Sequence, residues 1–179
     1  MIDLVEKNNI KSYVELGVYG GRSLLPVSLA MKAINTNPLI IGVDAWNLSN
    51  TKEGTADPTR DVHRDDWWSR IDHTFMYKYT IQLMMKYNLD NVKLYRISSL
   101  DFHDMVEDKS LDMLHQDGNH SQEISCKEVE LYHNKVRKGG FWIFDDTDFN
   151  STKAAQTKLE SYGYSCIHDA GGWKCYQRI

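Results

Sequence analysis

The chain has 179 residues, a length that fits one domain with a substantial core. Its hydrophobic content of 41% and charged content of 26% are ordinary for a globular protein, and its formal net charge is −4. Scattered lysines and arginines argue against a nucleic-acid partner. The lack of any apolar stretch near the ~18 residues that cross a bilayer, and of a leader pattern, argues against a membrane partner.

Strand-like and helix-like segments alternate along the chain, which predicts a parallel sheet covered by helices. Tyr13–Leu16 is the first expected strand, and a glycine-rich turn follows it. Ser23 is a suitable N-cap for a helix that extends to about Ile34. The second strand, Pro38–Val43, ends at Asp44.

Residues 47–88 form an insertion made of a loop and a helix. Residues 47–63 have no periodicity and are rich in Asn, Thr, Asp and Gly, which predicts a long loop of the kind that is usually functional or mobile. Apolar residues then recur at helical spacing, which predicts a helix whose aromatic stripe packs on the sheet: Trp68, Ile71, Phe75, Tyr79 and Leu83. Trp67 lies off this stripe and is the better candidate for contact with a ligand.

The second half of the chain continues the alternation. Three more strands are expected: Asn91–Arg96, Leu111–His115 and Phe141–Phe144. A short helix follows Ser98-Ser99, and a helix capped by Ser121 is expected to continue through Val136 until Gly139-Gly140 stops it. A last helix spans about 151–162.

The chain closes with two strand-like pieces, Tyr164–His168 and Trp173–Gln177. Their connection is so short that they must form an antiparallel hairpin. The three cysteines, of which Cys126 is the first, fit the reduced thiols of a cytoplasmic protein. Alternatively, Cys166 and Cys175 could face each other across the hairpin. We expect residues 1–179 to form a single domain.

Polar groups gather where two of the expected strands end. Asp117 and His120 follow the fourth strand, and Asp145-Asp146 follows the fifth. Ligands of open α/β sheets bind at such strand ends, so two ends side by side would place three carboxylates and an imidazole in one crevice. Oxygen ligands of this kind favour Mg²⁺, Ca²⁺ or Mn²⁺ over zinc. A solvated turn whose acids cap the next helix is the plainer alternative for Asp145-Asp146, and Asp148 is an alternative ligand or cap.

The turn after the first strand, Glu15-Leu-Gly-Val-Tyr-Gly-Gly-Arg-Ser23, is rich in glycine. Glycines let the backbone approach a ligand, and the helix N-terminus that follows favours an anionic group. Its spacing does not match the fingerprint G-x-G-x-x-G, which argues against a nicotinamide-dependent oxidoreductase. Asp44 could accept hydrogen bonds from a ribose diol. Taken alone, the turn could also be purely structural.

These motifs resemble those of class I S-adenosylmethionine-dependent methyltransferases. The pattern Glu-x-Gly-x-Tyr-x-Gly-x-Ser of the metal-dependent catechol O-methyltransferase branch is matched by Glu15, Gly17, Tyr19, Gly21 and Ser23. Asp117-Gly-Asn-His-Ser121, with Gly139-Gly140 and Asp145-Asp146 after it, is similar to the macrolide-sugar O-methyltransferases. The resemblance implies an α/β Rossmann-like methyltransferase fold. Its mostly parallel seven-stranded sheet would carry a C-terminal antiparallel hairpin and helices on both faces.

The resemblance also implies roles for individual residues. The cofactor, S-adenosylmethionine, would be bound by Glu15, Gly17, Tyr19, Gly21, Ser23, Asp44, Ala45, Trp46, Ser98, Ser99 and Asp117. A metal ion, Mg²⁺ or another hard divalent cation, would be bound by Asp117, Asp145 and Asp146. His120 would be the catalytic base, since histidine accepts a proton near neutral pH. Alternatively, His120 lies at the surface or caps the next helix, and His115 is expected to be a core histidine.

The expected function is methyl transfer from S-adenosylmethionine to a hydroxyl of a small sugar or phenolic molecule, with Mg²⁺ assistance. The alternatives are a cofactor-binding module without turnover and a metal-independent methyltransferase of the same fold. Residues 47–88 should determine the acceptor, with Trp46, Trp67 and Trp68. A homo-oligomer is compatible with the sequence. Asn119 has no assigned role, because the sugar branch has an aspartate at that position.

Overall fold

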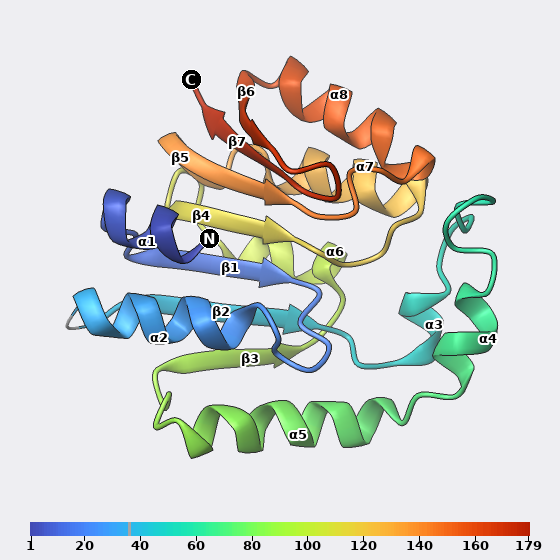
Figure 1. The fold of residues 1–179 in the computed structure, drawn as a ribbon, viewed down its shortest axis with the longest axis horizontal. Helices are drawn as coiled ribbons and strands as arrows, with labels where there is room; N and C mark the ends of the chain where they lie inside the picture. Colours follow the sequence, from blue (N-terminus) through green and yellow to red (C-terminus); the bar gives the residue numbers. More distant parts are fainter. Residues whose placement is uncertain (36) are drawn as a thin grey trace.

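The computed structural model describes residues 1–35 and 37–179. Within these residues, seven strands form one sheet of order β3-β2-β1-β4-β5-β7-β6 (Figure 1). The strands are β1 Ser12–Leu16, β2 Leu39–Asp44, β3 Val92–Arg96, β4 Leu111–Gln116, β5 Val136–Phe144, β6 Tyr164–Asp169 and β7 Lys174–Arg178. Neighbouring strands from β3 to β5 are parallel, and β7 is antiparallel to β5 and β6. The predicted mostly parallel sheet with a closing hairpin is confirmed.

Helices cover both faces of this sheet (Figure 1). They are α1 Ile2–Asn8, α2 Leu24–Ile34, α3 Leu48–Thr51, α4 Arg64–Ser69, α5 His73–Lys86, α6 Ser99–Phe102, α7 Gln122–Tyr132 and α8 Lys153–Ser161, with short 3-10 turns at η1 His103–Met105 and η2 Asn150–Thr152. Alternate residues of a strand point to opposite faces, so Tyr13 packs with α1, α2 and α5, whereas Val14 packs with α6, α7 and α8. α1 is an additional helix that was not predicted from the sequence.

The predicted aromatic stripe is wrong in its register. One helix was expected from Trp68 onward, but α4 ends at Ser69 and α5 begins at His73. Asp72 starts the new helix, because its side chain accepts a hydrogen bond from the Phe75 N–H at 2.9 Å. This restart turns Phe75 and Tyr79 outward, where they are 60% and 43% exposed. The face that packs on the sheet consists of Met76, Tyr77, Thr80, Leu83 and Met84.

The boundary between α7 and β5 also differs from the prediction. The helix ends at Tyr132 instead of continuing to the glycine pair, and β5 begins at Val136. Gly139-Gly140 lies inside the strand, where the pairing with β4 shifts register between Leu111 and Met113. A Cβ on Gly140 would lie 2.7 Å from Val136 Cγ1 and 2.9 Å from the Asp112 carbonyl oxygen. The glycines therefore permit a close approach within the sheet rather than ending a helix.

The turns after β1 and β4 are packed backbone against backbone. The Gly17 N–H donates to the Val43 carbonyl at 2.9 Å, and the Asp117 N–H donates to the Leu16 carbonyl at 2.8 Å. Gly17 has a positive φ of 87°, and a Cβ there would lie 2.0 Å from the Asp117 carbonyl oxygen. The glycine-rich turn and the first acidic strand end thus form one rigid unit.

The closing hairpin keeps its two cysteines apart. Cys166 is opposite Tyr176 in the register, and Cys175 is opposite His168. All three cysteines in the described part of the chain are free thiols. Among residues 1–35 and 37–179, no helix has both the length and the apolar character that crossing a membrane requires.

Candidate active site

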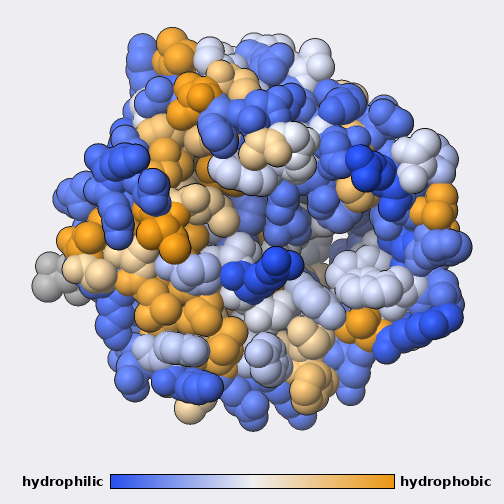
Figure 2. All heavy atoms as spheres, viewed as in Figure 1, coloured by the Kyte–Doolittle hydropathy of each residue, from blue (hydrophilic) through white to orange (hydrophobic). Residues whose placement is uncertain are grey.

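A cavity of about 290 Å³ opens at the carboxyl ends of β1, β2 and β4. We call residues 47–69, which include α3 and α4, the cover segment. Several of its residues line one side of the cavity. The space-filling view is hollowed between the cover segment and the body of the sheet, with hydrophilic residues above the opening and residues of intermediate hydropathy below it (Figure 2). Many of the sequence-predicted site residues line this cavity: Gly17, Tyr19, Ser23, Asp44, Ala45, Ser98, Ser99, Asp117 and His120.

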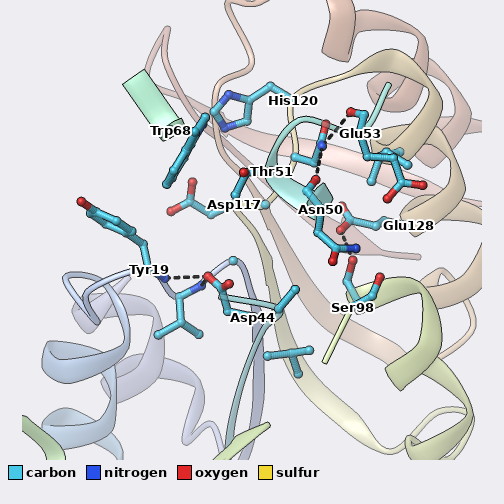
Figure 3. Close-up of a pocket in the computed structure, with 18 of the residues that line it drawn as sticks. Tyr19, Asp44, Asn50, Thr51, Glu53, Trp68, Ser98, Asp117, His120 and Glu128 are labelled. Carbon is cyan, nitrogen blue, oxygen red and sulfur yellow. Dashed lines mark hydrogen bonds between the residues drawn. The ribbon is translucent and has the colours of Figure 1, made fainter. Parts of the chain in front are cut away.

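Asp44 organises the glycine-rich turn (Figure 3). Its carboxylate accepts hydrogen bonds from the backbone N–H groups of Val18, Tyr19 and Trp46, at 3.1, 2.8 and 2.6 Å. Burial raises the pKa of Asp44, against the lowering effect of these three bonds. A carboxylate has about four lone-pair sites, so acceptor capacity is left for a hydroxyl group in the cavity.

Three predicted cofactor residues shape the cavity without lining it. Glu15 is fully buried, and its carboxylate accepts from the Ser23 hydroxyl at 2.7 Å and from the Tyr13 hydroxyl at 2.5 Å. Trp46 is buried and donates through Nε1 to the Tyr19 carbonyl at 2.8 Å. Gly21 faces α5. Ser23 does occupy the N-cap position of α2, but its side chain bonds Glu15 and not the helix.

The acidic strand ends lie together beside the cavity. The ligand atoms of Asp117, His120 and Asp146 lie within 4.8 Å of one another, and so do those of His115, Asp117 and Asp145. Asp117 belongs to both groups, whereas Asp145 and Asp146 fall into different ones. The three predicted metal ligands are therefore neighbours, but each group is completed by a histidine. Oxygen and nitrogen ligands at this separation fit a divalent cation.

His115 is buried, as expected of a core histidine, and it connects the two turns. Its Nδ1 lies 3.3 Å from the Tyr13 hydroxyl and 3.5 Å from Glu15 Oε2. Its Nε2 lies 4.0 Å from Asp117 Oδ2. The sequence analysis missed this position beside the acids, because the periodicity of a strand does not show which neighbours its side chains meet.

Two carboxylates of the cluster, Asp117 and Asp145, hold protons more tightly than usual. Burial raises the pKa of Asp117 to about 7, and the charges of Asp145 and Glu15 add to the effect. Burial likewise raises the pKa of Asp145. A divalent cation would offset this crowding of negative charge.

His120 forms a close pair with Asp146. The distance from His120 Nε2 to Asp146 Oδ2 is 2.7 Å, and the imidazole packs edge-on against Phe149. Burial alone would lower the pKa of His120, but Asp146, Asp117 and Asp61 together raise it above its usual value. The carboxylate thus fixes the orientation of the ring and leaves Nδ1 free to exchange a proton.

The individual residues of the cover segment and α7 that line the cavity were not predicted, although residues 47–88 were expected to determine the acceptor. These residues are Asn50, Thr51, Glu53, Asp61, Arg64, Ile124 and Glu128. Trp68 also lines the cavity and packs edge-on against Tyr19, while Trp67, the expected ligand contact, is 48% exposed outside it. Only Glu128 carried a sequence signal, since it is an acid at helical spacing from the apolar Ile124.

Glu128 should make the stability of the protein depend on pH. Burial raises its pKa from 4.5 to about 7, although the Ser99 hydroxyl and the Gln116 amide donate hydrogen bonds to it. The folded state therefore binds this proton more tightly than the unfolded chain, and stability falls as the pH rises from 4.5 through about 7. In Glu128→Gln this loss should disappear, so that the variant gains about 3 kcal/mol relative to the wild type between pH 4 and pH 8.

Urea unfolding of the ligand-free protein at both pH values measures this gain. The control is Glu130→Gln, whose stability relative to the wild type should change in the opposite direction. There Lys158 and Lys127 lower the pKa of the carboxyl, so its ionised form stabilises the fold above that pKa. A relative stability of Glu128→Gln that does not change with pH would contradict the assignment.

Solved structures resemble this fold at low sequence identity. The O-methyltransferase NovP superposes with a TM-score of 0.75 at 17% identity, over 99% of this chain and 76% of NovP. TomG from Streptomyces achromogenes, solved with S-adenosylmethionine, gives 0.64 at 12% identity over 99% and 77%. The Podospora anserina methyltransferase PaMTH1, solved with S-adenosylhomocysteine, gives 0.64 at 12% identity over 99% and 76%. No curated protein sequence matches the chain significantly.

The sheet order and the cavity at the strand ends define the fold of class I S-adenosylmethionine-dependent methyltransferases. Residues 14–147 match the family model described as a methyltransferase domain, and the chain belongs to this family. The protein is an S-adenosylmethionine-dependent methyltransferase.

Proposed function

We propose that the protein transfers a methyl group from S-adenosylmethionine to a hydroxyl of a small molecule, a sugar or a phenol, with the assistance of a divalent cation. The observation that carries this proposal is that one cavity is lined by two sets of residues with different chemistry. One set is the glycine-rich turn with Asp44, and the other includes Asp117 and His120 (Figure 3). NovP and TomG, which share the fold, are O-methyltransferases.

The turn and Asp44 would hold the cofactor. The free acceptor capacity of Asp44 suits the ribose hydroxyls, and Gly17, Val18 and Tyr19 of the turn line the cavity beside it. Ser98 and Ser99 line the same cavity beyond β3, where the adenine would lie. The volume of about 290 Å³ is near the lower end of the range for small-molecule sites.

The acidic cluster would activate the acceptor. Asp117, together with Asp145 or Asp146, would hold a hard divalent cation, which would supply Lewis-acid polarisation of the acceptor hydroxyl. His120 would take the hydroxyl proton at Nδ1, while Asp146 at 2.7 Å from Nε2 stabilises the resulting imidazolium. Tyr19 and Trp68 would form an aromatic wall beside the acceptor, from which water is partly excluded.

Calorimetry with S-adenosylmethionine, followed by mass spectrometry of sugar and phenol acceptors, tests the proposal. We expect cofactor binding at micromolar concentration and a product heavier by one methyl group. No binding at millimolar concentration by the folded protein would exclude the proposed cofactor site. Binding without turnover of any hydroxylated acceptor would point instead to a cofactor-binding module.

A metal-independent reaction is the second candidate, and the His120–Asp146 pair favours it. A histidine oriented by a carboxylate can remove a proton without a cation. Turnover in excess EDTA distinguishes the two: we expect activity to be lost and to return with Mg²⁺, whereas full activity in EDTA would support the metal-independent reaction.

A further inference from the structure

Asn119 joins the cover segment to the end of β4. Its Nδ2 donates to the carbonyl oxygens of Asn50 at 2.9 Å and Glu53 at 2.8 Å. Its Oδ1 accepts from the Ser121 N–H at 2.8 Å. Both N–H hydrogens of the amide therefore form hydrogen bonds to the cover segment, and the bond to its oxygen fixes the orientation of the side chain.

Further contacts reinforce this connection. A Cβ on Gly54, the next residue of the cover segment, would lie 2.3 Å from Ser121 Oγ, so the backbone of Gly54 lies close against the Ser121 side chain. Thr55 donates its N–H and its hydroxyl to the Glu123 carboxylate, at 3.2 and 3.0 Å. The buried Arg64 donates to the Lys52 and Gly54 carbonyls, which braces this part of the segment internally.

A second tether ties the cover segment to the loop after β5. The buried Asp57 carboxylate accepts from the Ser151 N–H at 2.9 Å. Arg60 forms an ion pair with Asp148 at 2.6 Å. The cover segment is thus attached to the same two loops that carry Asp117, His120, Asp145 and Asp146.

The residues bonded by Asn119 are also part of the cavity wall. Asn50 and Glu53 line the cavity, together with Thr51 between them, on the side away from Tyr19 (Figure 3). The two bonds from Asn119 are the contacts that hold Asn50 and Glu53 themselves to the loop after β4, so breaking them would loosen this part of the wall. A molecule seated between this wall and Asp44 would lie against the part of the cover segment that Asn119 holds.

We propose that Asn119 is a positioning residue that latches the cover segment over the cavity, and that opening this latch controls how fast the cofactor product leaves. The second statement rests on the proposed cofactor site. The amide is required because only it can donate two hydrogen bonds at this position. An aspartate could still accept from the Ser121 N–H with one oxygen, but its other oxygen would face the two carbonyl oxygens and leave these three oxygens without a donor.

The latch itself is tested without any ligand, by trypsin digestion of Asn119→Asp. The cover segment offers cleavage sites at Lys52 and Arg60, and we expect cleavage there to be about 10-fold faster than in the wild type, because two hydrogen bonds are lost. Asn119→Ala, which removes the donors without adding charge, should behave similarly and serves if the aspartate variant does not fold. Gln122→Glu adds the same charge at an exposed neighbouring position and should cleave like the wild type.

Equal cleavage rates in wild type, Asn119→Asp and Asn119→Ala would overturn the latch. Its role in release is measured by stopped-flow tryptophan fluorescence, since Trp67 and Trp68 belong to the cover segment. We expect S-adenosylhomocysteine to dissociate about 10-fold faster from Asn119→Ala than from the wild type or Gln122→Glu, and an unchanged rate would overturn control of release. If S-adenosylhomocysteine binds to no variant, the proposed cofactor site fails and release control fails with it, while the digestion still decides the latch.

Discussion

Asp117→Ala should lower turnover by about 100-fold or more and should abolish tight binding of Mn²⁺, used as a probe for the cation. The reason is that Asp117 is the only residue shared by both groups of ligand atoms in the described part of the chain. Without it, Asp145 and Asp146 each retain only one histidine partner. The expected loss of turnover is of the size seen when an active site loses one group that stabilises the charge developing in the transition state.

Turnover is measured as S-adenosylhomocysteine formed with an acceptor from the screen, and Mn²⁺ binding by electron paramagnetic resonance. The matched control is Asp90→Ala, which removes an exposed carboxylate just before β3. This residue lies at the amino ends of the strands, whereas the cavity lies at their carboxyl ends. If the Asp117→Ala variant binds Mn²⁺ as tightly as the Asp90→Ala control and has the same turnover, the cation has no place in the proposed mechanism.

Gly17→Ala should destabilise the fold by about 3 kcal/mol or more. The new Cβ would lie 2.0 Å from the Asp117 carbonyl oxygen and 2.6 Å from Gly118 Cα, and both contacts are with backbone that hydrogen bonds hold in place. Alanine would also be strained at the φ of 87°. Overpacking costs about 1–3 kcal/mol and an unfavourable backbone conformation costs a similar amount.

The control separates these two costs. Gly171 has nearly the same φ, 84°, but a Cβ there would meet nothing within 4 Å. Gly171→Ala should therefore lose only about 1 kcal/mol, which reflects the strained backbone alone. Urea unfolding of both variants measures the difference. Equal losses would mean that the two turns are not packed as tightly as the structure describes.

The sheet could be predicted because each strand carries its own local signal. Apolar runs bounded by glycine or acids located all seven strands, and the short connection before Trp173 required an antiparallel hairpin. The errors occurred where a side chain or a backbone contact overrides periodicity. Asp72 caps a new helix and rotates the aromatic stripe, and Gly140 admits a close approach inside β5 that resembles a helix stop in sequence.

The candidate site was predictable only in part, for a related reason. A motif identifies the turns after β1 and β4, but it does not show which side chains face the cavity. Glu15 matches the motif, yet it lies beneath the turn and bonds Ser23 and Tyr13. The bonds from Asn119 to Asn50 and Glu53 join residues far apart in the chain, so no local pattern reveals them.

The cover segment adds no strand to the sheet and is attached to it largely by side chains such as Asn119 and Asp57. The glycine-rich turn therefore belongs to a framework in which a change such as Gly17→Ala is costly, whereas the cover segment depends on a small number of side-chain bonds. We therefore expect that exchanging residues 47–69 between related enzymes, with both attachment points retained, would transfer acceptor preference without rebuilding the fold.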